Sequence, residues 1–210
     1  MAFEIIKDQK STNFGKGGNK NYKIEVNFVI VHYTAGTEIG DLPTLLGKTS
    51  KEVSAHYYVT KDGRIYELVA PPKRAWHAGV SKWEHNGRVY NSLNEWSIGI
   101  ELENLNGNDN QYPKVQIEAL VFLAKYLQNI YPILMDPLRW IGHEDICPGR
   151  KFDPGKLFPW TSFRNSIGSP TSDPDWLISM RWLYNYCRND QTGLRNLNII
   201  RSVLRELTGK

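Results

Sequence analysis

The sequence predicts an α/β protein in which a mixed central β-sheet is flanked by helices. Apolar or alternating runs indicate strands, and apolar residues at helical spacing indicate a long helix between two of these runs. Because strands and helices interleave, we expect the helices to pack on the faces of one sheet. The chain has 210 residues, enough for one such domain and a small appendage.

The first part of the chain predicts an extended segment, a strand and a short helix. Residues 1–23 are rich in Lys, Asn, Gly and Ser, which indicates an extended lead-in. Residues 28–31 are apolar throughout, as expected for a central strand covered on both faces. The small residues at 34–36 end that strand, and residues 39–46 are predicted to form a short helix.

A hairpin and a long connection follow. The β-branched and aromatic runs 55–60 and 65–69 lie on either side of Asp62-Gly63, which is a strong hairpin signal. Residues 74–94 are predicted to be loop.

The next elements are a strand, a helix and a strand. Residues 97–103 alternate as in a strand, which places Glu101 and Glu103 on one face. Apolar residues at helical spacing between Pro113 and Pro132 predict a helix that these prolines delimit. Residues 138–141 predict a short buried strand.

A polar, proline-containing stretch over residues 168–174 predicts a boundary. We therefore expect one domain over 1–167 and a helical extension over 168–210, with helices near 175–188 and 194–207. The apolar side chains of this extension are expected to pack on the main domain. The alternative is that they form a binding face of their own.

Composition indicates a soluble globular protein whose mild positive charge is compatible with an anionic polymer such as a cell wall. The net charge of +4 is too small to predict binding to nucleic acid. The first ten residues lack an apolar run, so no signal peptide and no membrane span are expected. The lack of a signal peptide predicts a cytoplasmic protein, with export to the periplasm or beyond by another route as the alternative. We expect a monomer, but the sequence leaves the oligomeric state open. Cys147 and Cys187 are read as free thiols, and their pairing stays open.

Two histidines and one aspartate predict a metal site. His32 and His143 each stand at the end of a predicted strand, and neighbouring strand ends can meet. Asp153 follows His143 by ten positions, across a loop of Pro, Gly and Arg. Two imidazoles and a carboxylate leave the fourth tetrahedral position open, which is the arrangement of a catalytic zinc ion. The alternative is that these histidines are structural hydrogen-bonding residues.

Five motifs in this order resemble the type 2 family of zinc N-acetylmuramoyl-L-alanine amidases. This family includes phage lysozyme-type amidases and the animal peptidoglycan recognition proteins, and the chain looks most like its AmpD/AmiD branch. The resemblance covers roughly residues 28–160. The motifs are Val31-His32-Tyr33-Thr34-Ala35, Ser54-Ala55-His56-Tyr57, Ala75-Trp76-His77-Ala78-Gly79, Ser97-Ile98-Gly99-Ile100-Glu101-Leu102-Glu103, and Gly142-His143-Glu144-Asp145-Ile146 with Arg150-Lys151-Phe152-Asp153-Pro154-Gly155.

The resemblance implies a peptidoglycan-recognition-protein-like amidase fold and a hydrolase that binds Zn²⁺. It implies zinc on His32, His143 and Asp153, Glu101 as general base, and Lys151 as the residue that stabilises the developing oxyanion. The implied reaction is hydrolysis of the amide between N-acetylmuramic acid, or its anhydro form, and L-alanine of the stem peptide. The partner would be peptidoglycan or a muropeptide, in cell wall degradation or murein recycling.

Further roles are expected for residues around this set. Cys147 lies too early for the family's ligand position and is interpreted as a packing residue. His56 is expected to be structural, and His85 to be solvated in a polar loop. The residues expected to contact substrate are Tyr33, Thr34, Trp76 and His77.

Other interpretations remain open at this point. Glu101 alternatively forms a salt bridge at the sheet edge, and Arg150 with Lys151 alternatively forms a solvated loop pair. The chain as a whole is alternatively a non-catalytic peptidoglycan-sensing module, or a nucleic-acid binder. Within the amidase interpretation, sequence details look closer to the AmiD type, which favours broad wall-fragment specificity over small anhydromuropeptides alone.

Overall fold

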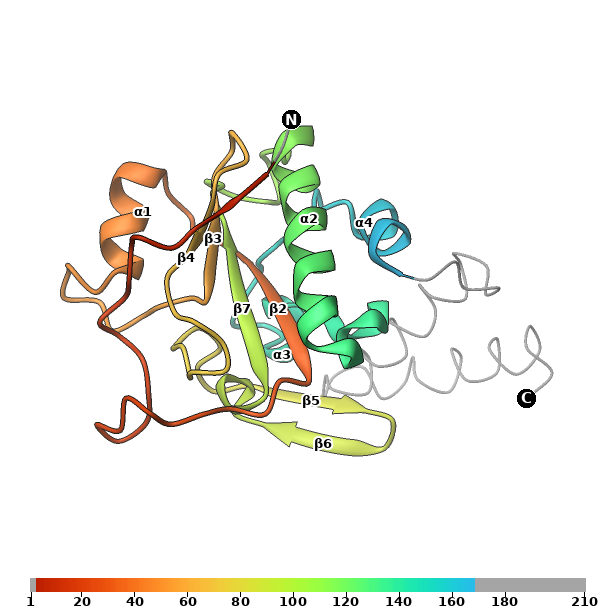
Figure 1. The fold of residues 1–210 in the computed structure, drawn as a ribbon. Coiled ribbons are helices and arrows are strands. Elements are labelled where there is room, and N and C mark those ends of the chain that lie inside the picture. The colour runs from red at the N-terminus through yellow and green to blue at the C-terminus, as the bar shows by residue number, and fades with distance from the viewer. Residues whose placement is uncertain (1–2, 169–210) are drawn as a thin grey trace.

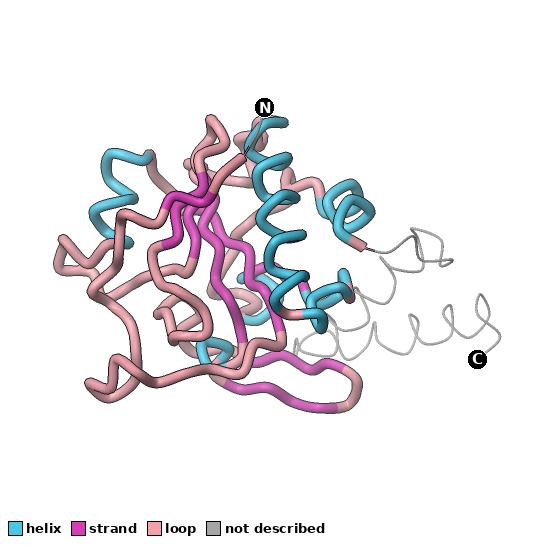
Figure 2. The backbone as a smooth tube through the Cα atoms, viewed as in Figure 1, coloured by secondary structure: helices cyan, strands magenta, loops and turns pink. Residues whose placement is uncertain are grey.

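The computed structural model describes residues 3–168 and has the predicted mixed sheet with helices on its faces (Figure 1). Figure 2 shows that long loops connect the helices and strands around this sheet. The two helical segments expected near the C-terminus lie outside the described residues. Within residues 3–168, no helix combines the length and the apolar character needed to cross a membrane.

A six-stranded sheet forms the centre of the molecule, with the spatial order β1-β4-β3-β7-β2-β8. Every neighbouring pair is parallel except β3 with β4, which form the predicted antiparallel hairpin. The carboxyl ends of β3, β7, β2 and β8 therefore lie at one edge of the sheet. The strands are β1 (Ile5–Ile6), β2 (Phe28–Tyr33), β3 (Tyr57–Val59), β4 (Ile65–Glu67), β7 (Ser97–Leu102) and β8 (Trp140–Gly142).

Within residues 3–168, four α-helices and three short 3-10 turns accompany the sheet. The prolines that were expected to delimit the long helix do so: Pro113 precedes it, and Pro132 begins the turn after it. The α-helices are α1 (Glu38–Leu45), α2 (Lys114–Ile130), α3 (His143–Ile146) and α4 (Trp160–Ile167). The 3-10 turns are η1 (Leu93–Glu95), η2 (Pro132–Met135) and η3 (Pro137–Arg139).

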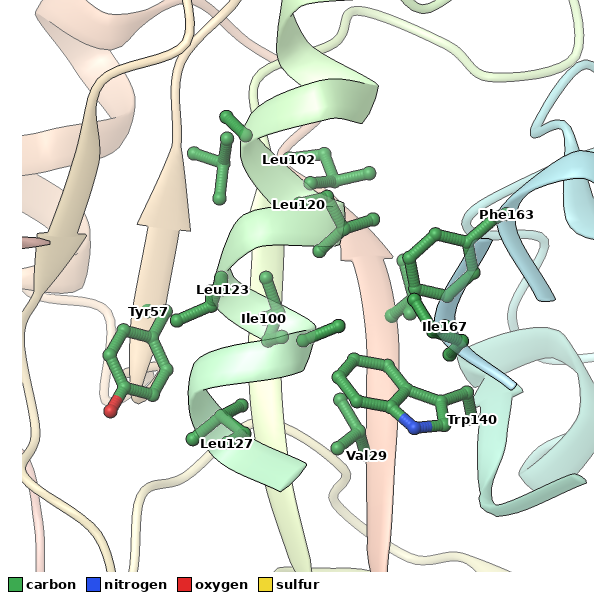
Figure 3. Packing of buried hydrophobic residues seen from close by; sticks show 14 of the residues in the cluster. Val29, Tyr57, Ile100, Leu102, Leu120, Leu123, Leu127, Trp140, Phe163 and Ile167 are labelled. Carbon is green, nitrogen blue, oxygen red and sulfur yellow. The ribbon is translucent and has the colours of Figure 1, made fainter. Parts of the chain in front are cut away.

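Helix α2 covers one face of the sheet and forms the main core with it. Figure 3 shows its leucines against Ile100 and Leu102 of β7, with Phe163 of α4 beside them. The three leucines that face the sheet, each with 0% of its surface exposed, are Leu120, Leu123 and Leu127. Full burial of a leucine side chain stabilises a fold by about 1.5–3 kcal/mol. This packing therefore anchors α2 across β7 and β2.

The opposite face of the sheet carries a small hairpin and helix α1. Phe28 and Ile30 of β2 pack with Trp83 and Tyr90 of the hairpin formed by strands β5 (Lys82–His85) and β6 (Arg88–Asn91). Farther along the same face, α1 packs against β3 and β4 through a second apolar cluster that includes Leu45, Tyr58 and Tyr66. This face therefore has two separate coverings, α1 and the hairpin.

The hairpin β5–β6 corrects the prediction that residues 74–94 are loop. Asn86 and Gly87 form its two-residue tip with φ angles of 50° and 79°. Asn-Gly is the preferred sequence for such a tip, because both residues tolerate positive φ. The signal was present in the sequence, but the polar composition of the stretch obscured it.

His85 was expected to be solvated, and this expectation was wrong. Its side chain is buried on β5, with the ring edge-on to Phe28 at 5.5 Å between centroids. Its Nε2 lies 3.5 Å from a carboxylate oxygen of Asp136. The expectation failed because burial here depends on partners from β2 and from the stretch before β8, which the local sequence does not reveal.

The extended lead-in also contributes to the sheet. Ile5 and Ile6 form the short edge strand β1, which pairs in parallel with Ile65 and Tyr66 of β4. The rest of the lead-in wraps the outside of the sheet, where the Ser11 backbone N–H donates to Leu68 O at 2.9 Å.

Candidate metal centre and its cleft

Three neighbouring parallel strands bring the predicted residues together. The register pairs His32 of β2 with Glu101 of β7, and Val31 of β2 with Gly142 of β8. His143 follows Gly142 directly, as the first residue of α3. His32, Glu101 and His143 therefore lie in a row at the carboxyl edge of the sheet, which is where open α/β sheets bind their ligands.

Alternation along β2 points His32 away from α2. Val29 and Val31 pack with α2, whereas Phe28 and Ile30 pack with the β5–β6 hairpin. Because side chains alternate between the faces of a strand, His32 shares the hairpin face with Phe28 and Ile30. The candidate site thus lies on the face that α2 leaves free.

Asp153 reaches this edge on a loop that is held at two points. The backbone N–H of Glu144 donates to Asp153 O at 2.9 Å, and the hydroxyl of Tyr112 donates to Pro154 O at 2.8 Å. Asp153 is 8% exposed, and His32 and His143 are 1% and 3% exposed. The three side chains thus converge in a nearly closed environment.

The three candidate ligand atoms form a compact triangle. His32 Nδ1 lies 2.9 Å from His143 Nδ1 and 2.9 Å from Asp153 Oδ2, and His143 Nδ1 lies 3.0 Å from Asp153 Oδ2. This group can hold a metal ion.

The donor set and its dimensions fit a tetrahedral zinc ion. Ligand atoms 2.0–2.1 Å from such an ion stand about 3.3 Å apart, so the triangle would need to open by only about 0.3–0.4 Å. Two imidazole nitrogens and one carboxylate oxygen are also the ligand types of catalytic zinc sites. The side chains of all three residues line one cleft, on which the remaining coordination position can open.

Protonation in this triangle is unequal. Burial lowers the pKa of His32 to about 4, and the neighbouring His143 contributes in the same direction. Burial alone would lower the pKa of His143 too, but its interactions with Asp153 and Cys147 together outweigh burial and raise the pKa to about 9. Burial would raise the pKa of Asp153, but the hydrogen bond from His143 and the charge of that ring hold it well below its usual range. At neutral pH one proton on His143 is therefore shared with the other two groups.

Two further carboxyl groups make the surroundings favourable for a cation. Burial raises the pKa of Glu101 to about 8, and the charge of Asp153 adds to this effect. Burial also raises the pKa of Glu144 to about 8, with Asp145 and Asp153 adding to it. A nearby positive charge would favour the ionised form of each group.

A cleft of about 680 Å³ opens above the triangle. One wall comes from α1, through residues such as Asp41 and Thr44, and another from the loop that carries Lys151 and Phe152. Glu101 lines this cleft beside His32, and its Oε2 is buried without a hydrogen-bond partner among the described residues. The structure therefore places Glu101 and Lys151 in the same cleft as the triangle.

The four residues expected to contact substrate, Tyr33, Thr34, Trp76 and His77, also line the cleft. The orientation of the Trp76 ring is fixed in part by a hydrogen bond, because its indole N–H donates to Gly15 O at 2.8 Å. His77 contacts His32, with His32 Nε2 lying 3.1 Å from His77 Nδ1. Contact of these residues with substrate remains a prediction.

Contacts describe the surroundings of three further residues. Glu103 accepts hydrogen bonds from the backbone N–H groups of Glu38 and Lys61, which leaves Glu101 as the carboxylate facing the triangle. His56 is structural, because it links the Gly99 backbone N–H to Lys73 O. Cys147 is a free thiol in the cluster that packs on the β5–β6 hairpin.

Sequence reasoning missed two residues in and behind the cleft. Phe152 lines it with 62% of its surface exposed, although an apolar residue within a charged, turn-rich loop was a visible signal. Asn94 was not singled out either. Its side chain accepts hydrogen bonds from the backbone N–H groups of His77 and Ala78, and nothing in the local sequence indicates this.

Comparison with known proteins agrees with this geometry. The model of the N-acetylmuramoyl-L-alanine amidase family matches residues 22–156. Escherichia coli N-acetylmuramoyl-L-alanine amidase AmiD is 40% identical over 149 residues, which cover 64% of this chain and 51% of AmiD. Escherichia coli 1,6-anhydro-N-acetylmuramyl-L-alanine amidase AmpD is 40% identical over 121 residues, which cover 57% of this chain and 61% of AmpD. The chain thus spans between half and two thirds of these curated relatives.

Solved structures show the same fold. The structure of AmiD in complex with the substrate anhydro-N-acetylmuramic acid-L-Ala-D-gamma-Glu-L-Lys matches with a TM-score of 0.61 at 36% identity, covering 73% of this chain and 62% of AmiD. The crystal structure of AmpDh3 from Pseudomonas aeruginosa matches with a TM-score of 0.65 at 32% identity, covering 87% of this chain and 75% of AmpDh3. On the strength of the family match, which spans more than half of its length, this chain belongs to the N-acetylmuramoyl-L-alanine amidase family.

Proposed function

We propose that this chain is a zinc amidohydrolase that cleaves the amide between N-acetylmuramic acid, or its anhydro form, and L-alanine of a stem peptide. The observation that carries the proposal is the triangle of His32, His143 and Asp153 beneath a cleft that also contains Glu101 and Lys151. Family membership and the amidase activity named for AmiD and AmpD support the same reaction.

In this proposal His32 Nδ1, His143 Nδ1 and Asp153 Oδ2 hold the zinc ion. When bound, zinc would supply a Lewis acid and lower the pKa of a water molecule. The His143 proton must leave before its Nδ1 can act as a ligand, because a nitrogen that carries a proton has no lone pair to donate.

Glu101 is proposed as the general base. It lies next to His32 in the strand register and faces the cleft without a competing hydrogen bond among the described residues. Its carboxylate would accept a proton from the attacking water and pass it to the leaving amine of L-alanine. A carboxyl group with a raised pKa suits both halves of that transfer, because it holds a proton readily and releases it beside a cation.

Lys151 is proposed to stabilise the negative charge that develops on the carbonyl oxygen. Lys151 lines the same cleft as His32 and Glu101, which supports a position of its ammonium group near the reacting atoms. Removal of one such positioned donor typically raises the barrier by about 3–4 kcal/mol.

The proposed substrate class is the muropeptide. The AmiD complex contains an anhydromuramyl tripeptide, and AmpDh3 has been solved with an anhydromuramic pentapeptide. The cleft of this chain, at about 680 Å³, is of the size that accepts part of such a molecule. Tyr33, Thr34, Trp76 and His77 are proposed to line the path of its sugar and peptide.

The test is digestion of intact peptidoglycan and of isolated anhydromuropeptides by the zinc-loaded protein, followed by mass spectrometry. We expect free stem peptides with an L-alanine amino terminus from both substrates. Binding to peptidoglycan without any released peptide would instead identify a sensing module and refute the proposed reaction.

Two variants separate the proposed roles within the site. Glu101→Ala should retain zinc but lose turnover, whereas His143→Ala should lose the metal. Equal zinc content in His143→Ala and the unmodified protein would refute the ligand assignment, whatever the effect on activity.

A further inference from the structure

Both candidate histidine ligands turn their outer ring nitrogen toward the same short segment. His143 Nε2 lies 3.3 Å from the carbonyl oxygen of Ala78. His32 Nε2 lies 3.1 Å from Nδ1 of His77, the residue before Ala78. One dipeptide therefore contacts the outer nitrogens of two ligands that stand 111 positions apart in the sequence.

The Ala78 carbonyl fixes the orientation of His143. A carbonyl oxygen only accepts hydrogen bonds, so the proton at this contact belongs to His143 Nε2. With Nε2 protonated, the neutral imidazole directs the lone pair of Nδ1 into the triangle. Arg150 Nη2 and the Cys147 thiol also approach the Ala78 oxygen, at 3.4 Å and 3.7 Å, so this carbonyl is oriented among three donors.

The Nδ1 lone pair of His32 is also directed into the triangle, but here the orienting carbonyl acts through the ring of His77. His77 Nε2 lies 3.4 Å from the backbone oxygen of Ser97, which again only accepts. The proton of a neutral His77 is therefore on Nε2, and His77 Nδ1 is an acceptor. His32 must then donate from Nε2, which leaves the lone pair of His32 Nδ1 for the metal.

The reversed arrangement is disfavoured by the Ser97 carbonyl. If His77 carried its proton on Nδ1, His32 would accept at Nε2 and carry its own proton on Nδ1, where a ligand needs a lone pair. The unprotonated His77 Nε2 would then face the lone pairs of Ser97 O. The backbone of β7 thus selects the tautomer of His32 through His77.

The dipeptide is itself held in place. Asn94 Oδ1 accepts from the His77 backbone N–H at 3.0 Å and from the Ala78 backbone N–H at 2.7 Å, and Asn94 is 6% exposed. The His77 ring lies against Gly99 of β7, where a Cβ atom would overlap it. The two backbone hydrogen bonds to Asn94 and the packing of the ring against Gly99 together define where Nδ1 of His77 points.

We propose that His77-Ala78 orients both imidazole ligands and that His77 is a positioning residue which sets the tautomer of His32 for metal binding. This inference rests on the zinc site proposed above. Partners that orient metal-bound histidines typically change metal affinity about 10- to 100-fold when they are removed. The role is separate from the substrate contact predicted for His77 and does not require substrate.

The experiment measures the zinc dissociation constant by competition with a chelator at fixed pH. His77→Leu keeps similar bulk but removes the acceptor, and we expect about 10- to 100-fold weaker binding. His77→Asn places an amide oxygen where Nδ1 was, and we expect it to recover most of that affinity. Thermal unfolding of the metal-free variants checks that both are folded.

His56 provides the matched control. It is a buried histidine with two hydrogen bonds, its ring lies 5.7 Å from that of His77, and it contacts neither histidine ligand in the structure. His56→Leu should lower thermal stability but leave the zinc affinity of the folded protein within about threefold. A loss in His56→Leu equal to that in His77→Leu would show general destabilisation and overturn the proposal.

Long-range ¹H–¹⁵N spectra of the zinc-loaded, unmodified protein test the tautomer without any variant. We expect the proton of His32 on Nε2, and that of His77 on Nε2 with Nδ1 unprotonated. Protonated Nδ1 on His77, or wild-type affinity in His77→Leu, would refute this inference alone. Failure of the unmodified protein to bind zinc would instead refute the proposed metal site.

Discussion

The uneven protonation of the triangle should make the proposed zinc binding depend on pH in a defined direction. His143 carries a proton below its pKa of about 9, while His32, with a pKa of about 4, is already neutral above pH 5. Zinc must displace the His143 proton, so affinity should rise with pH until His143 is neutral in the metal-free protein. For one displaced proton the change is tenfold, or about 1.4 kcal/mol, per pH unit.

The effect of the His143 proton alone on the zinc dissociation constant can be measured in the variant Glu101→Gln at low pH. Glu101→Gln removes a second group that would lose its proton beside a cation, since the pKa of Glu101 is about 8. Between about pH 5 and pH 6.5, below the usual pKa of zinc-bound water, the zinc dissociation constant of this variant should fall about 30-fold. Glu144, whose pKa is also about 8, would also lose a proton beside the cation. Its loss makes zinc affinity rise more steeply with pH and does not reverse the direction.

The assay is chelator competition at several pH values, together with NMR of the His143 ring in the metal-free protein. We expect an imidazolium at His143 and a neutral ring at His32 at pH 6. Zinc affinity that does not change over this range, or a neutral His143 in the metal-free protein, would refute the reasoning.

Three further outcomes are expected. Glu101→Gln should keep zinc content near one per chain while kcat falls about 10²- to 10⁴-fold, and unchanged kcat in steady-state assays would remove Glu101 from the mechanism. Lys151→Ala should lower kcat about 10²- to 10³-fold at unchanged zinc affinity, so a variant that instead loses metal would indicate a role in holding the site. In urea unfolding, Leu123→Ala should cost about 2–5 kcal/mol because the side chain is fully buried under α2, whereas exposed Lys125→Ala should stay within about 0.5 kcal/mol.

The residues of the triangle were accessible to sequence analysis because each marks the end of a recognisable pattern. His32 ends an apolar strand, and His143 follows the short buried strand before a turn-rich loop. Parallel pairing then makes their meeting at one sheet edge a consequence of topology. Asp153 was harder to place by spacing alone, because its loop is positioned by contacts from Glu144 and Tyr112.

Other features were not accessible because they depend on partners far away in the sequence. The buried position of His85 requires Phe28 of β2, and the tautomer of His32 depends on a backbone carbonyl of Ser97. A main-chain oxygen has no residue-type signature, so no motif could reveal its role. The β5–β6 hairpin is a different case, because its Asn86-Gly87 tip was readable but lay within a polar stretch.

The three candidate ligand atoms come from two regions of the chain, since His32 and Asp153 are separated by 121 positions. An ion held between them would act as a removable cross-link that closes most of the folded domain into one loop. Such a link favours the native state by mass action, in proportion to the logarithm of free metal over its dissociation constant. Metal supply would then set not only the proposed activity but also the free energy that holds the edge strand β8 in the sheet.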